Sequence, residues 1–327
     1  MAKIAITGAT GFVGRYVVPV LGAAGHEVTA LVRSPASAQA AEALGASSVV
    51  CDLSDPAALA TALEGAQSVV HMAARLDFSG AYPDFFADNV LLTERVLAAS
   101  EAAGVPRFVH VGAAAVAIGA KAPSPLTETA EPCGRRAGHY GATKWLGEQR
   151  VMARNSDRFR CIVLRPPLVW AEDAPVFDTI AAAAAGRRFV WIDGGRYSVA
   201  TIHAENLAAG IGAALTQDAL AGVYFVSDGE CLPFRELVGT ALKARGMPVP
   251  GLSLPRWAAS LSGLGMEMLW RVFRLQGSPP ITPSLVDLIG GDFRIDDSKA
   301  RRALGYRDRV SVAEGLARLR GEVRPHN

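Results

Sequence analysis

Residues 3–14 read KIAITGATGFVG, and this stretch gives the strongest indication of the fold. The β-branched run Lys3–Thr7 leads into a T-G-x-x-G-x-x-G motif, and an amphipathic helix is predicted to follow over Gly14–Ala24. Glycines in such a turn let the backbone approach a pyrophosphate, and the N–H groups at the helix N-terminus bind its charge. The stretch therefore predicts a dinucleotide site, with a purely structural turn as the alternative. The predicted cofactor-binding residues of the motif are Gly8, Thr10, Gly11, Phe12, Val13 and Gly14.

The remainder of the first half alternates short β-branched runs with stretches rich in alanine and leucine, which is typical of a parallel sheet covered by helices. We predict further helices over Pro56–Leu63, Phe85–Ala103 and Tyr140–Ala153. The predicted strands are Lys3–Thr7, Glu27–Val32, Ser48–Cys51, Ser68–His71, Phe108–Val111 and Cys161–Leu164. The expected fold class is α/β, a doubly wound parallel Rossmann sheet with a smaller C-terminal substrate-binding region.

The alternation breaks after Pro166-Pro167, which divides the chain into two expected parts. Residues 1–166 are expected to form the dinucleotide-binding Rossmann domain, and residues 167–327 a mainly substrate-binding region. One more short strand is predicted at Tyr224–Ser227. The segment over residues 200–228, approximately, is therefore expected to pack back on the Rossmann domain.

Composition and charge exclude several classes of protein. Half of the 327 residues are hydrophobic and the net charge is +2, so the chain has no basic stripe suited to nucleic acid. The four cysteines are far apart and have neither zinc-ligand spacing nor a disulfide framework, so no metal site is expected. The chain opens on a strand rather than a secretory leader, and no long apolar run suggests a membrane span. We therefore expect a cytoplasmic protein.

The end of the second predicted strand bears on the choice of dinucleotide. NAD sites usually place Asp or Glu there to bind the ribose 2′-hydroxyl, whereas here Val32 is followed by Arg33. A guanidinium can bind a 2′-phosphate through two hydrogen bonds, so we favour NADP(H), with NAD as the alternative. Otherwise Arg33 stacks on the adenine or points to solvent. Asp52, after the third strand, either accepts a bond from the adenine amine or forms a turn before Ser54.

Tyr140 and Lys144 form a Y-x-x-x-K pattern, which places a phenol and an ammonium one turn apart on one helical face. A free tyrosine has a pKa of about 10 and is only ~0.1% ionised at pH 7. Lys144 and a positively charged nicotinamide are therefore predicted to lower the pKa of Tyr140. The pair predicts hydride transfer to or from a secondary alcohol, with Tyr140 as the catalytic proton relay and Lys144 assisting.

On these motifs the chain resembles the extended short-chain dehydrogenase/reductases of the NAD-dependent epimerase/dehydratase superfamily, over nearly its whole length. Further matching runs are Asp52-Leu53, His71-Met72-Ala73-Ala74, Asp88-Asn89-Val90, Leu164-Arg165-Pro166-Pro167 and His203-Ala204-Glu205-Asn206. The resemblance implies that Asn89 lies in a helix behind the site and that two copies form a homodimer through the Tyr140 helix. It also implies cofactor contacts from Asp52, Leu53, Ala73, Ala74 and Pro167.

The C-terminal part resembles one branch of that family. Asp292–Ala300 and the ending Ala303-Leu304-Gly305-Tyr306 are similar to the 3β-hydroxysteroid (sterol) dehydrogenases. This similarity implies a hydrophobic small-molecule substrate, sterol-, steroid- or terpenoid-like.

One position departs from the family pattern. The family normally carries Ser or Thr after the fifth strand to hold the substrate oxygen, and here that position falls at about Ala114. A positioned donor of this kind is worth roughly 10²–10³ in rate. Either another group supplies the donor, the enzyme is slow, or catalysis has been lost. Thr127 and Thr143 are the substitutes that the sequence offers.

Two segments are candidates for the substrate side. Pro255–Leu275 carries an apolar stripe at helical spacing, which fits an amphipathic core helix, a lid over a hydrophobic substrate or a peripheral membrane contact made with Arg256, Arg271 and Arg274. Candidate substrate contacts follow the fourth strand, where a crevice is expected, although a plain surface loop is equally consistent. They are Arg75, Asp77, Phe78 and Tyr82, together with Ala114.

Three functions remain open on the sequence. The first is an NADP(H)-linked dehydrogenase or reductase of a hydrophobic alcohol or ketone. The second is a nucleotide-sugar epimerase or dehydratase, which the missing acid at the second strand argues against. The third is a catalytically weak, cofactor-binding accessory protein, which Ala114 favours and the intact pair of Tyr140 and Lys144 opposes. His203 and Glu205, two residues apart, are expected to be structural rather than a metal or acid/base pair.

Overall fold

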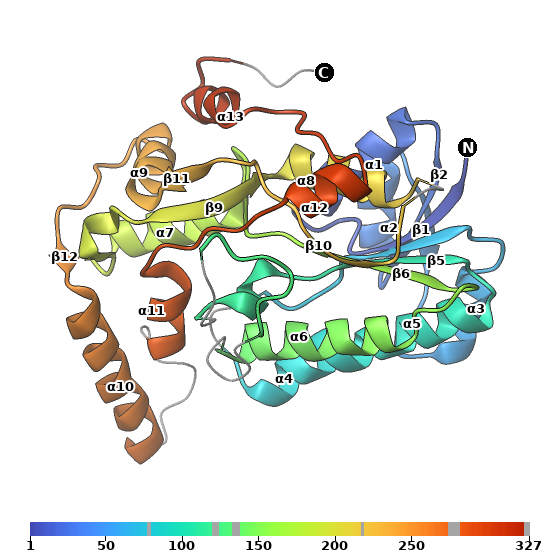
Figure 1. Cartoon of the computed structure of the whole chain (residues 1–327), viewed down its shortest axis with the longest axis horizontal. Coiled ribbons are helices and arrows are strands. Elements are labelled where there is room, and N and C mark those ends of the chain that lie inside the picture. The colour runs from blue at the N-terminus through green and yellow to red at the C-terminus, as the bar shows by residue number, and fades with distance from the viewer. Residues whose placement is uncertain (77–79, 120–123, 133–137, 217–218, 274–281, 324–327) are drawn as a thin grey trace.

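The main sheet lies between two layers of helices, as Figure 1 shows. The computed structural model describes residues 1–76, 80–119, 124–132, 138–216, 219–273 and 282–323. Seven parallel strands lie in the order β10-β6-β5-β4-β1-β2-β3. They are β1 (Lys3–Thr7), β2 (Glu27–Val32), β3 (Ser47–Val50), β4 (Ser68–His71), β5 (Arg107–Val111), β6 (Arg160–Arg165) and β10 (Gly222–Phe225). The predicted doubly wound parallel sheet is confirmed.

One layer buries Ile4, Val70 and Val109 of the sheet under four helices. These helices are α1 (Gly14–Ala23), α2 (Pro35–Glu42), α8 (Ala204–Ala214) and α12 (Ser298–Ala303). The other layer buries Val69 and Phe108, their neighbours in sequence, under α3 (Pro56–Ala62), α5 (Leu92–Ala102) and α6 (Gly138–Ala153). The near-continuous apolar strands follow from this arrangement, because a parallel sheet is buried on both faces.

The helix predicted over Phe85–Ala103 is interrupted in the structure. It is divided into α4 (Tyr82–Phe86), a π-helical segment at Ala87–Leu91, and α5. A π-helical turn inside a helix often occurs at a functional site, where it turns a side chain away from the regular helical position. Here the segment contains Asn89, whose contacts are described below.

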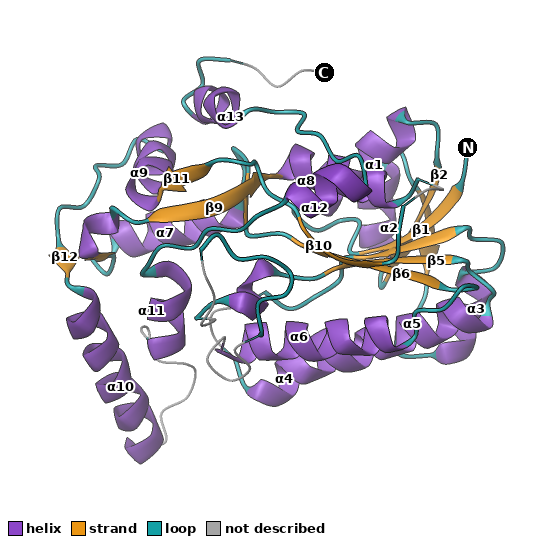
Figure 2. Cartoon of the chain, viewed as in Figure 1, coloured by secondary structure: helices purple, strands orange, loops and turns teal. Residues whose placement is uncertain are grey.

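The C-terminal half adds a smaller assembly (Figure 2), in which strands β7 (Leu168–Trp170), β9 (Ser198–His203) and β11 (Cys231–Pro233) form a sheet in the order β11-β9-β7. Helices α7 (Pro175–Ala185), α9 (Phe234–Ala244) and α13 (Val312–Leu319) supply side chains to its core. A further pair, β8 (Trp191–Ile192) and β12 (Ser253–Leu254), leads into α10 (Arg256–Phe273), which packs on α11 (Pro283–Ile289).

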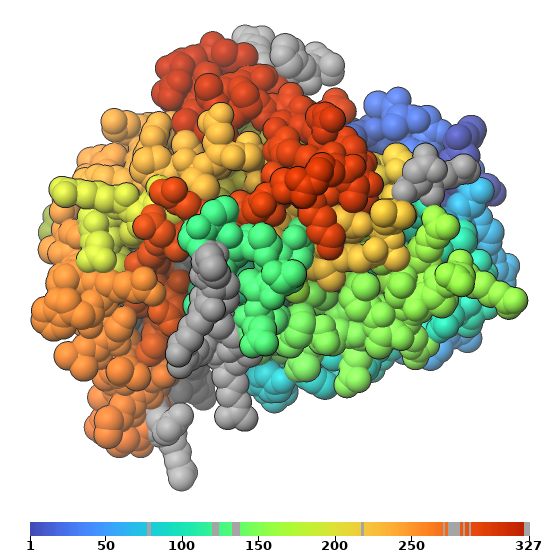
Figure 3. All heavy atoms as spheres, viewed as in Figure 1, coloured from blue at the N-terminus to red at the C-terminus, as the bar shows by residue number. Residues whose placement is uncertain are grey.

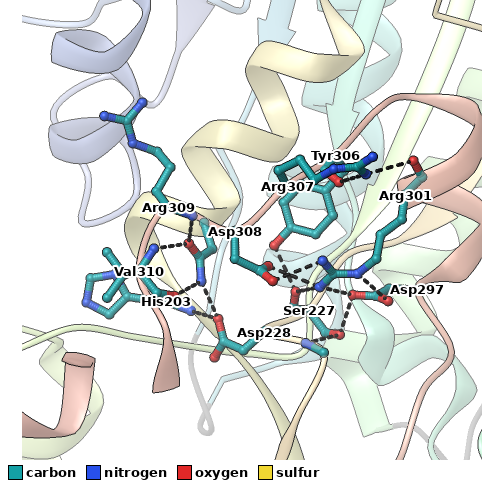
Figure 4. Close-up of polar contacts among 12 residues, drawn as sticks. His203, Ser227, Asp228, Asp297, Arg301, Tyr306, Arg307, Asp308, Arg309 and Val310 are labelled. Atoms are coloured by element: carbon teal, nitrogen blue, oxygen red, sulfur yellow. Dashed lines mark hydrogen bonds and ion pairs between the residues drawn. The ribbon is translucent and has the colours of Figure 1, made fainter. Parts of the chain in front are cut away.

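The buried carboxylate of Asp228 connects β7, β9 and α8 through hydrogen bonds, and Figure 4 shows part of this network. Asp228 Oδ1 accepts hydrogen bonds from the His203 backbone N–H at 2.7 Å and from Asn206 Nδ2 at 2.8 Å. Its Oδ2 accepts from Trp170 Nε1 at 2.9 Å. Asn206 Oδ1 in turn accepts from the backbone of Val310 at 2.9 Å, which fixes the C-terminal segment. The His203 side chain caps α8, since its Nδ1 accepts the Glu205 N–H at 3.3 Å, which agrees with the structural role expected from the sequence.

Candidate active site

The loop after β1 has the close approaches that a dinucleotide site requires. Gly8 has a φ of +78°, and a Cβ there would lie 2.9 Å from the Ala73 nitrogen, so only glycine fits. A Cβ on Gly14 would lie 2.2 Å from the Ala9 carbonyl oxygen. Gly8 thus brings the carboxyl ends of β1 and β4 together, and Gly14 lets α1 begin directly against the turn.

The N-terminus of α1 presents unused donors. Within the described chain, no hydrogen bond is recorded for the backbone N–H groups of Thr10, Phe12 and Val13. These groups precede Gly14, the first residue of α1, where the positive end of the helix dipole lies. The loop therefore fits a diphosphate, and the sequence prediction for Gly8, Thr10, Gly11, Phe12, Val13 and Gly14 is consistent with this geometry.

Sequence reasoning missed the contacts that hold this helix to the C-terminal half. Asp173 pairs with Arg15 Nη2 at 2.8 Å and accepts a hydrogen bond from Tyr16 Oη at 2.6 Å. Phe12 meets the Tyr16 ring edge-on. Because the partners are 157 residues apart in sequence, no local pattern signals the contact.

The Arg33 and Asp52 side chains differ in their contacts. Arg33 is exposed at the end of β2, and no hydrogen bond or ion pair of its guanidinium is recorded among the described residues. Asp52 instead accepts from the Ser54 backbone N–H and hydroxyl, each at 2.8 Å, and these bonds lower the pKa of its carboxyl. The turn offered as the alternative for Asp52 is therefore present, and its adenine contact stays a prediction.

The remaining cofactor residues implied by resemblance surround the same edge of the sheet. Ala73 donates its backbone N–H to Thr7 Oγ1 at 3.3 Å, and Ala74 follows it, exposed. Leu53 packs in the core. Pro167 is partly exposed directly after β6.

Tyr140 and Lys144 lie on α6, but their polar groups have different surroundings. Lys144 is 2% exposed, and its Nζ donates to the Val111 carbonyl oxygen at 2.6 Å, at the carboxyl end of β5. No hydrogen bond of the Tyr140 hydroxyl is recorded among the described residues. The helix thus carries a buried cation anchored to the sheet and a phenol with a free hydroxyl.

Burial shifts both pKa values in this structure. Desolvation raises the pKa of Tyr140 and lowers the pKa of Lys144 to about 8, while Glu148 acts against the lowering. The direction for Tyr140 is opposite to the lowering expected from the sequence. The reason is that burial disfavours the phenolate, and the Lys144 ammonium is directed at a carbonyl oxygen instead of the phenol.

The structure also locates the alanines after β5. The Ala114 side chain is fully buried with Val116, Leu126 and Phe225 in an apolar cluster, and its N–H bonds the Pro166 carbonyl oxygen at 2.8 Å. Ala113 is also buried and has an extended backbone, with φ −157° and ψ 138°, but it is not part of that apolar cluster.

Neither threonine suggested as a substitute donor is free. Thr143 Oγ1 donates to the His139 carbonyl oxygen at 2.7 Å and accepts from Asn89 Nδ2 at 3.1 Å. Thr127 Oγ1 lies 2.7 Å from Thr129 Oγ1 on an exposed turn. Both hydroxyls are therefore already engaged.

The candidate substrate residues only partly converge. Tyr82 is exposed at the start of α4, and its ring meets His139 edge-on at the start of α6. Arg75 is bound to Asp88 and Asn89, with its N–H 2.7 Å from Asn89 Oδ1. Asp77 and Phe78 lie outside the described residues.

Helix α10 corrects one interpretation of the sequence. Its stripe is exposed, with Trp257 at 72%, Met268 at 70% and Leu264 at 55%, whereas the small residues Ala259 and Gly263 face inward. The segment, orange in Figure 3, forms a projection at one end of the molecule. The core-helix interpretation is therefore wrong for this stripe, because α11 packs on a different face of α10, the one that carries Ala259 and Gly263. Arg274 and the side chain of Arg271 lie outside the described part.

The described residues contain neither a metal-binding cluster nor a membrane-spanning helix. Among them, no group of three or more His, Cys, Asp or Glu side chains is placed to hold a metal ion. Similarly, no helix in the described ranges has the length and apolar character that crossing a membrane would require.

Several known proteins are similar to this chain over most of its length. A 4-hydroxy-2-methyl-3-oxo-4-farnesyl-3,4-dihydroquinoline-1-oxide ketoreductase of Stigmatella aurantiaca is 35% identical, over 96% of this chain and 95% of that protein. A 2-alkyl-3-oxoalkanoate reductase of Stenotrophomonas maltophilia is 34% identical, over 97% and 98%. A decarboxylating sterol-4-alpha-carboxylate 3-dehydrogenase of Dictyostelium discoideum is 29% identical, over 98% and 100%.

A solved structure and a family profile agree with these relatives. The crystal structure of gox2253 superposes with a TM-score of 0.78 at 25% identity, covering 99% of this chain and 100% of that one. The sequence profile of the NAD dependent epimerase/dehydratase family matches residues 4–226. The resemblance inferred from the motifs, including its sterol dehydrogenase branch, is thereby confirmed, and the chain belongs to the NAD dependent epimerase/dehydratase family with the fold of an extended short-chain dehydrogenase/reductase.

Proposed function

We propose that this protein is an NADP(H)-dependent oxidoreductase that interconverts a secondary alcohol and a ketone on a hydrophobic, sterol-, steroid- or terpenoid-like substrate. The observation that carries the proposal is the placement of Tyr140 and the buried Lys144 one turn apart on α6, with Lys144 bonded to the end of β5 at the sheet edge that also holds the phosphate loop, Gly8–Gly14. Among the described residues, no hydrogen bond of the Tyr140 hydroxyl is recorded. The three relatives described above are named as reductases or a dehydrogenase, and their named substrates include a farnesyl group, a sterol and a 2-alkyl chain.

The chain's own residues supply binding and proton transfer. Gly8–Gly14 would hold the diphosphate and Arg33 the 2′-phosphate of a dinucleotide, which supplies or accepts the hydride when bound. Tyr140 would donate a proton to the carbonyl oxygen during reduction and accept it during oxidation. Below a pH of about 8, Lys144 is an ammonium in a dry site, where its charge favours the phenolate form that Tyr140 takes after donating.

The preference for NADP(H) rests on Arg33, which is exposed and for which no ion pair is recorded among the described residues. A guanidinium binds a phosphate through charge-assisted hydrogen bonds, and no Asp or Glu follows β2 to bind a 2′-hydroxyl or repel the phosphate. Arg33→Asp should weaken NADPH binding by roughly 10–100-fold and leave NADH binding similar or tighter. Equal losses for both dinucleotides would remove Arg33 from the phosphate site.

A second candidate function is a cofactor-binding accessory protein, which the alanines after β5 favour. Because the Ala114 methyl lies in an apolar cluster, we place the missing hydroxyl at Ala113 instead. Ala113→Ser should then raise kcat, by up to about 10²-fold, if only the donor is missing. Ala114→Ser should lower stability without a gain in rate, because its hydroxyl would be buried among apolar groups.

The deciding experiment is titration calorimetry with NADPH and NADH, followed by turnover of a panel of ketosteroids, terpenoid ketones and the matching alcohols. Tighter binding of NADPH and turnover of at least one ketone is the expected result. Binding without turnover across the panel would favour the accessory function. Failure to bind either dinucleotide would contradict the proposal as a whole.

We also propose that the exposed stripe of α10, formed by Trp257, Leu261, Leu264, Met268 and Val272, contacts an anionic bilayer surface. Charge complementarity supports this partner. Arg187, Arg188 and Arg196 are exposed on either side of β8, the strand that pairs with β12 just before α10. No carboxylate partner of theirs is recorded in the described chain. Arg196 follows the turn of Asp193, whose carboxylate accepts the Arg256 N–H at 2.9 Å. Apolar residues beside cations are typical of helices that lie on membranes.

Vesicle sedimentation tests this contact. The protein should bind phosphatidylcholine vesicles that contain phosphatidylglycerol more tightly than vesicles of phosphatidylcholine alone, and Leu264→Asp with Met268→Asp should abolish binding. Concentration-dependent self-association that the same double substitution removes would show that a second copy covers the stripe instead.

A further inference from the structure

A continuous set of buried hydrogen bonds crosses the carboxyl edge of the sheet. His71, at the end of β4, lies between Thr7 of β1 and Thr93 of α5, with Nδ1 2.7 Å from Thr7 Oγ1 and Nε2 3.0 Å from Thr93 Oγ1. All three residues are at most 1% exposed. Their polar groups thus connect two strands and a helix without water.

The direction of each bond in this set follows from its neighbours. Thr93 Oγ1 donates its proton to the Asn89 carbonyl oxygen at 2.9 Å, so it must accept from His71 Nε2. Burial lowers the pKa of His71 to about 3, so the ring is neutral and its Nδ1 accepts from the Thr7 hydroxyl. The Thr7 oxygen then accepts the Ala73 N–H at 3.3 Å. Every donor has one acceptor, which leaves a single tautomer for His71.

The set continues from Asn89 to the helix that carries Tyr140. Asn89 Oδ1 accepts from the Arg75 N–H at 2.7 Å, which orients its amide so that Nδ2 donates to Thr143 Oγ1 at 3.1 Å. Gly147 permits this approach, since a Cβ there would lie 2.5 Å from the Asn89 carbonyl oxygen. At its other end the set reaches Thr7, the residue before Gly8.

We infer that His71 and Thr93 are positioning residues that hold the phosphate loop in register with the Tyr140 helix. The inference rests on the proposed function, in which both elements contact one dinucleotide. The phosphate loop and α6 can contact the same dinucleotide only if β1, β4 and α6 stay at fixed distances from one another. The π-helical segment makes the link, because Asn89 serves both Thr93 and Thr143 from one residue.

The chain offers a matched control on the same helix. Ser100 of α5 is also fully buried, and its hydroxyl also donates to the carbonyl oxygen four residues earlier, Val96, at 2.7 Å. No bond from Ser100 to His71 or to the π-helical segment is recorded in the described residues. Ser100→Ala therefore removes the same kind of hydrogen bond without cutting the connection.

The test compares Thr93→Val, Thr93→Ser and Ser100→Ala with the unchanged chain, by NADPH calorimetry, thermal unfolding and kinetics. Thr93→Val keeps the side-chain shape and removes the hydroxyl. We expect a roughly 10-fold rise in the NADPH Kd and a similar fall in kcat, the scale of one lost hydrogen bond, with the KM of the ketone unchanged. Thr93→Ser should restore both values, and Ser100→Ala should lower Tm alone. If Thr93→Val does not fold, Thr7→Val cuts the same connection at its other end.

Each outcome decides the inference. A Thr93→Val variant with unchanged NADPH affinity and kcat, or a Ser100→Ala variant with the same losses, would overturn it. If the unchanged chain binds NADPH but turns over no substrate, the proposed catalysis fails, while the calorimetry still decides the positioning role. If the unchanged chain binds neither dinucleotide, both proposals fail.

Discussion

Helices α6 and α10 have similar lengths, 16 and 18 residues, but they differ in which side chains they bury and which they expose. Helix α6 buries Lys144 and Glu148 against the sheet, and each has a partner there, Val111 or Arg165. Helix α10 exposes Trp257, Leu264 and Met268 and packs on α11 through the face that carries Ala259 and Gly263. Apolar periodicity therefore predicts an amphipathic helix, but it does not predict what covers the apolar face.

This difference in burial predicts that substitutions on α6 should have larger effects than substitutions on α10. On α6, even a small substitution should disturb side chains that are buried and already in contact with the sheet. On α10 the large side chains of the stripe are exposed, so the stability of the chain should depend little on them.

Removal of the Tyr140 hydroxyl should have the largest effect. Tyr140→Phe is expected to lower kcat by about 10²–10⁴-fold, the usual contribution of a positioned proton donor, without loss of NADPH binding. The control is Tyr224→Phe on β10, whose hydroxyl binds the Leu220 carbonyl oxygen at 2.9 Å and should not affect turnover. Retained activity in Tyr140→Phe would assign the proton transfer to another group.

Two glycine substitutions test how closely each helix is packed against its neighbours. In Gly147→Ala the new Cβ would lie 2.5 Å from the Asn89 carbonyl oxygen, so the free energy of unfolding should fall by about 1–3 kcal/mol. In Gly265→Ala on α10 the Cβ meets nothing within 4 Å, so stability should rise by about 0.5–1 kcal/mol from helix propensity. Urea unfolding measures both; a stabilised Gly147→Ala would show that α6 can move away from the π-helical segment.

The pH dependence tests the buried cation of α6. Burial lowers the pKa of Lys144 from 10.5 to about 8, so the ammonium is lost above that pH. If the charge assists Tyr140, kcat/KM should fall about 10-fold per pH unit there. Stability should respond oppositely, because between pH 8 and 10.5 the unfolded chain holds more protons and the Lys144 contribution to stability grows with pH. A flat activity profile to pH 10 would exclude a role for the ammonium.

The smallest effect is expected on the α10 stripe. Met268→Gln should change the free energy of unfolding by less than about 0.5 kcal/mol, because the side chain is 70% exposed. Val286→Ala on α11, which is buried against Ile192 and Ala259, should cost about 2 kcal/mol. A large loss in Met268→Gln would indicate that the stripe is covered in solution.

The sequence predicted the sheet and the glycine-rich turn after β1 well, because local signals specify them. Strands Lys3–Thr7, Glu27–Val32 and Ser68–His71 are confirmed at their bounds. The break at Ala87–Leu91 could not be predicted, because it depends on the contacts of Asn89 with Thr143, 54 residues away. The sequence left open whether the stripe of α10 is buried or exposed for the same reason, since only tertiary structure shows that α11 covers the face of Ala259 and Gly263.

The position of β10 at the edge of the main sheet has a consequence for synthesis of the chain. Strand β6 ends at Arg165, but the strand that pairs with its outer edge begins at Gly222. While the ribosome is still making the residues between them, the nascent Rossmann half has a hydrogen-bonding edge without its partner, a surface on which other chains can add strands. A ribosome that stalls within that interval would thus release a fragment with the phosphate loop present and the β6 edge open to aggregation.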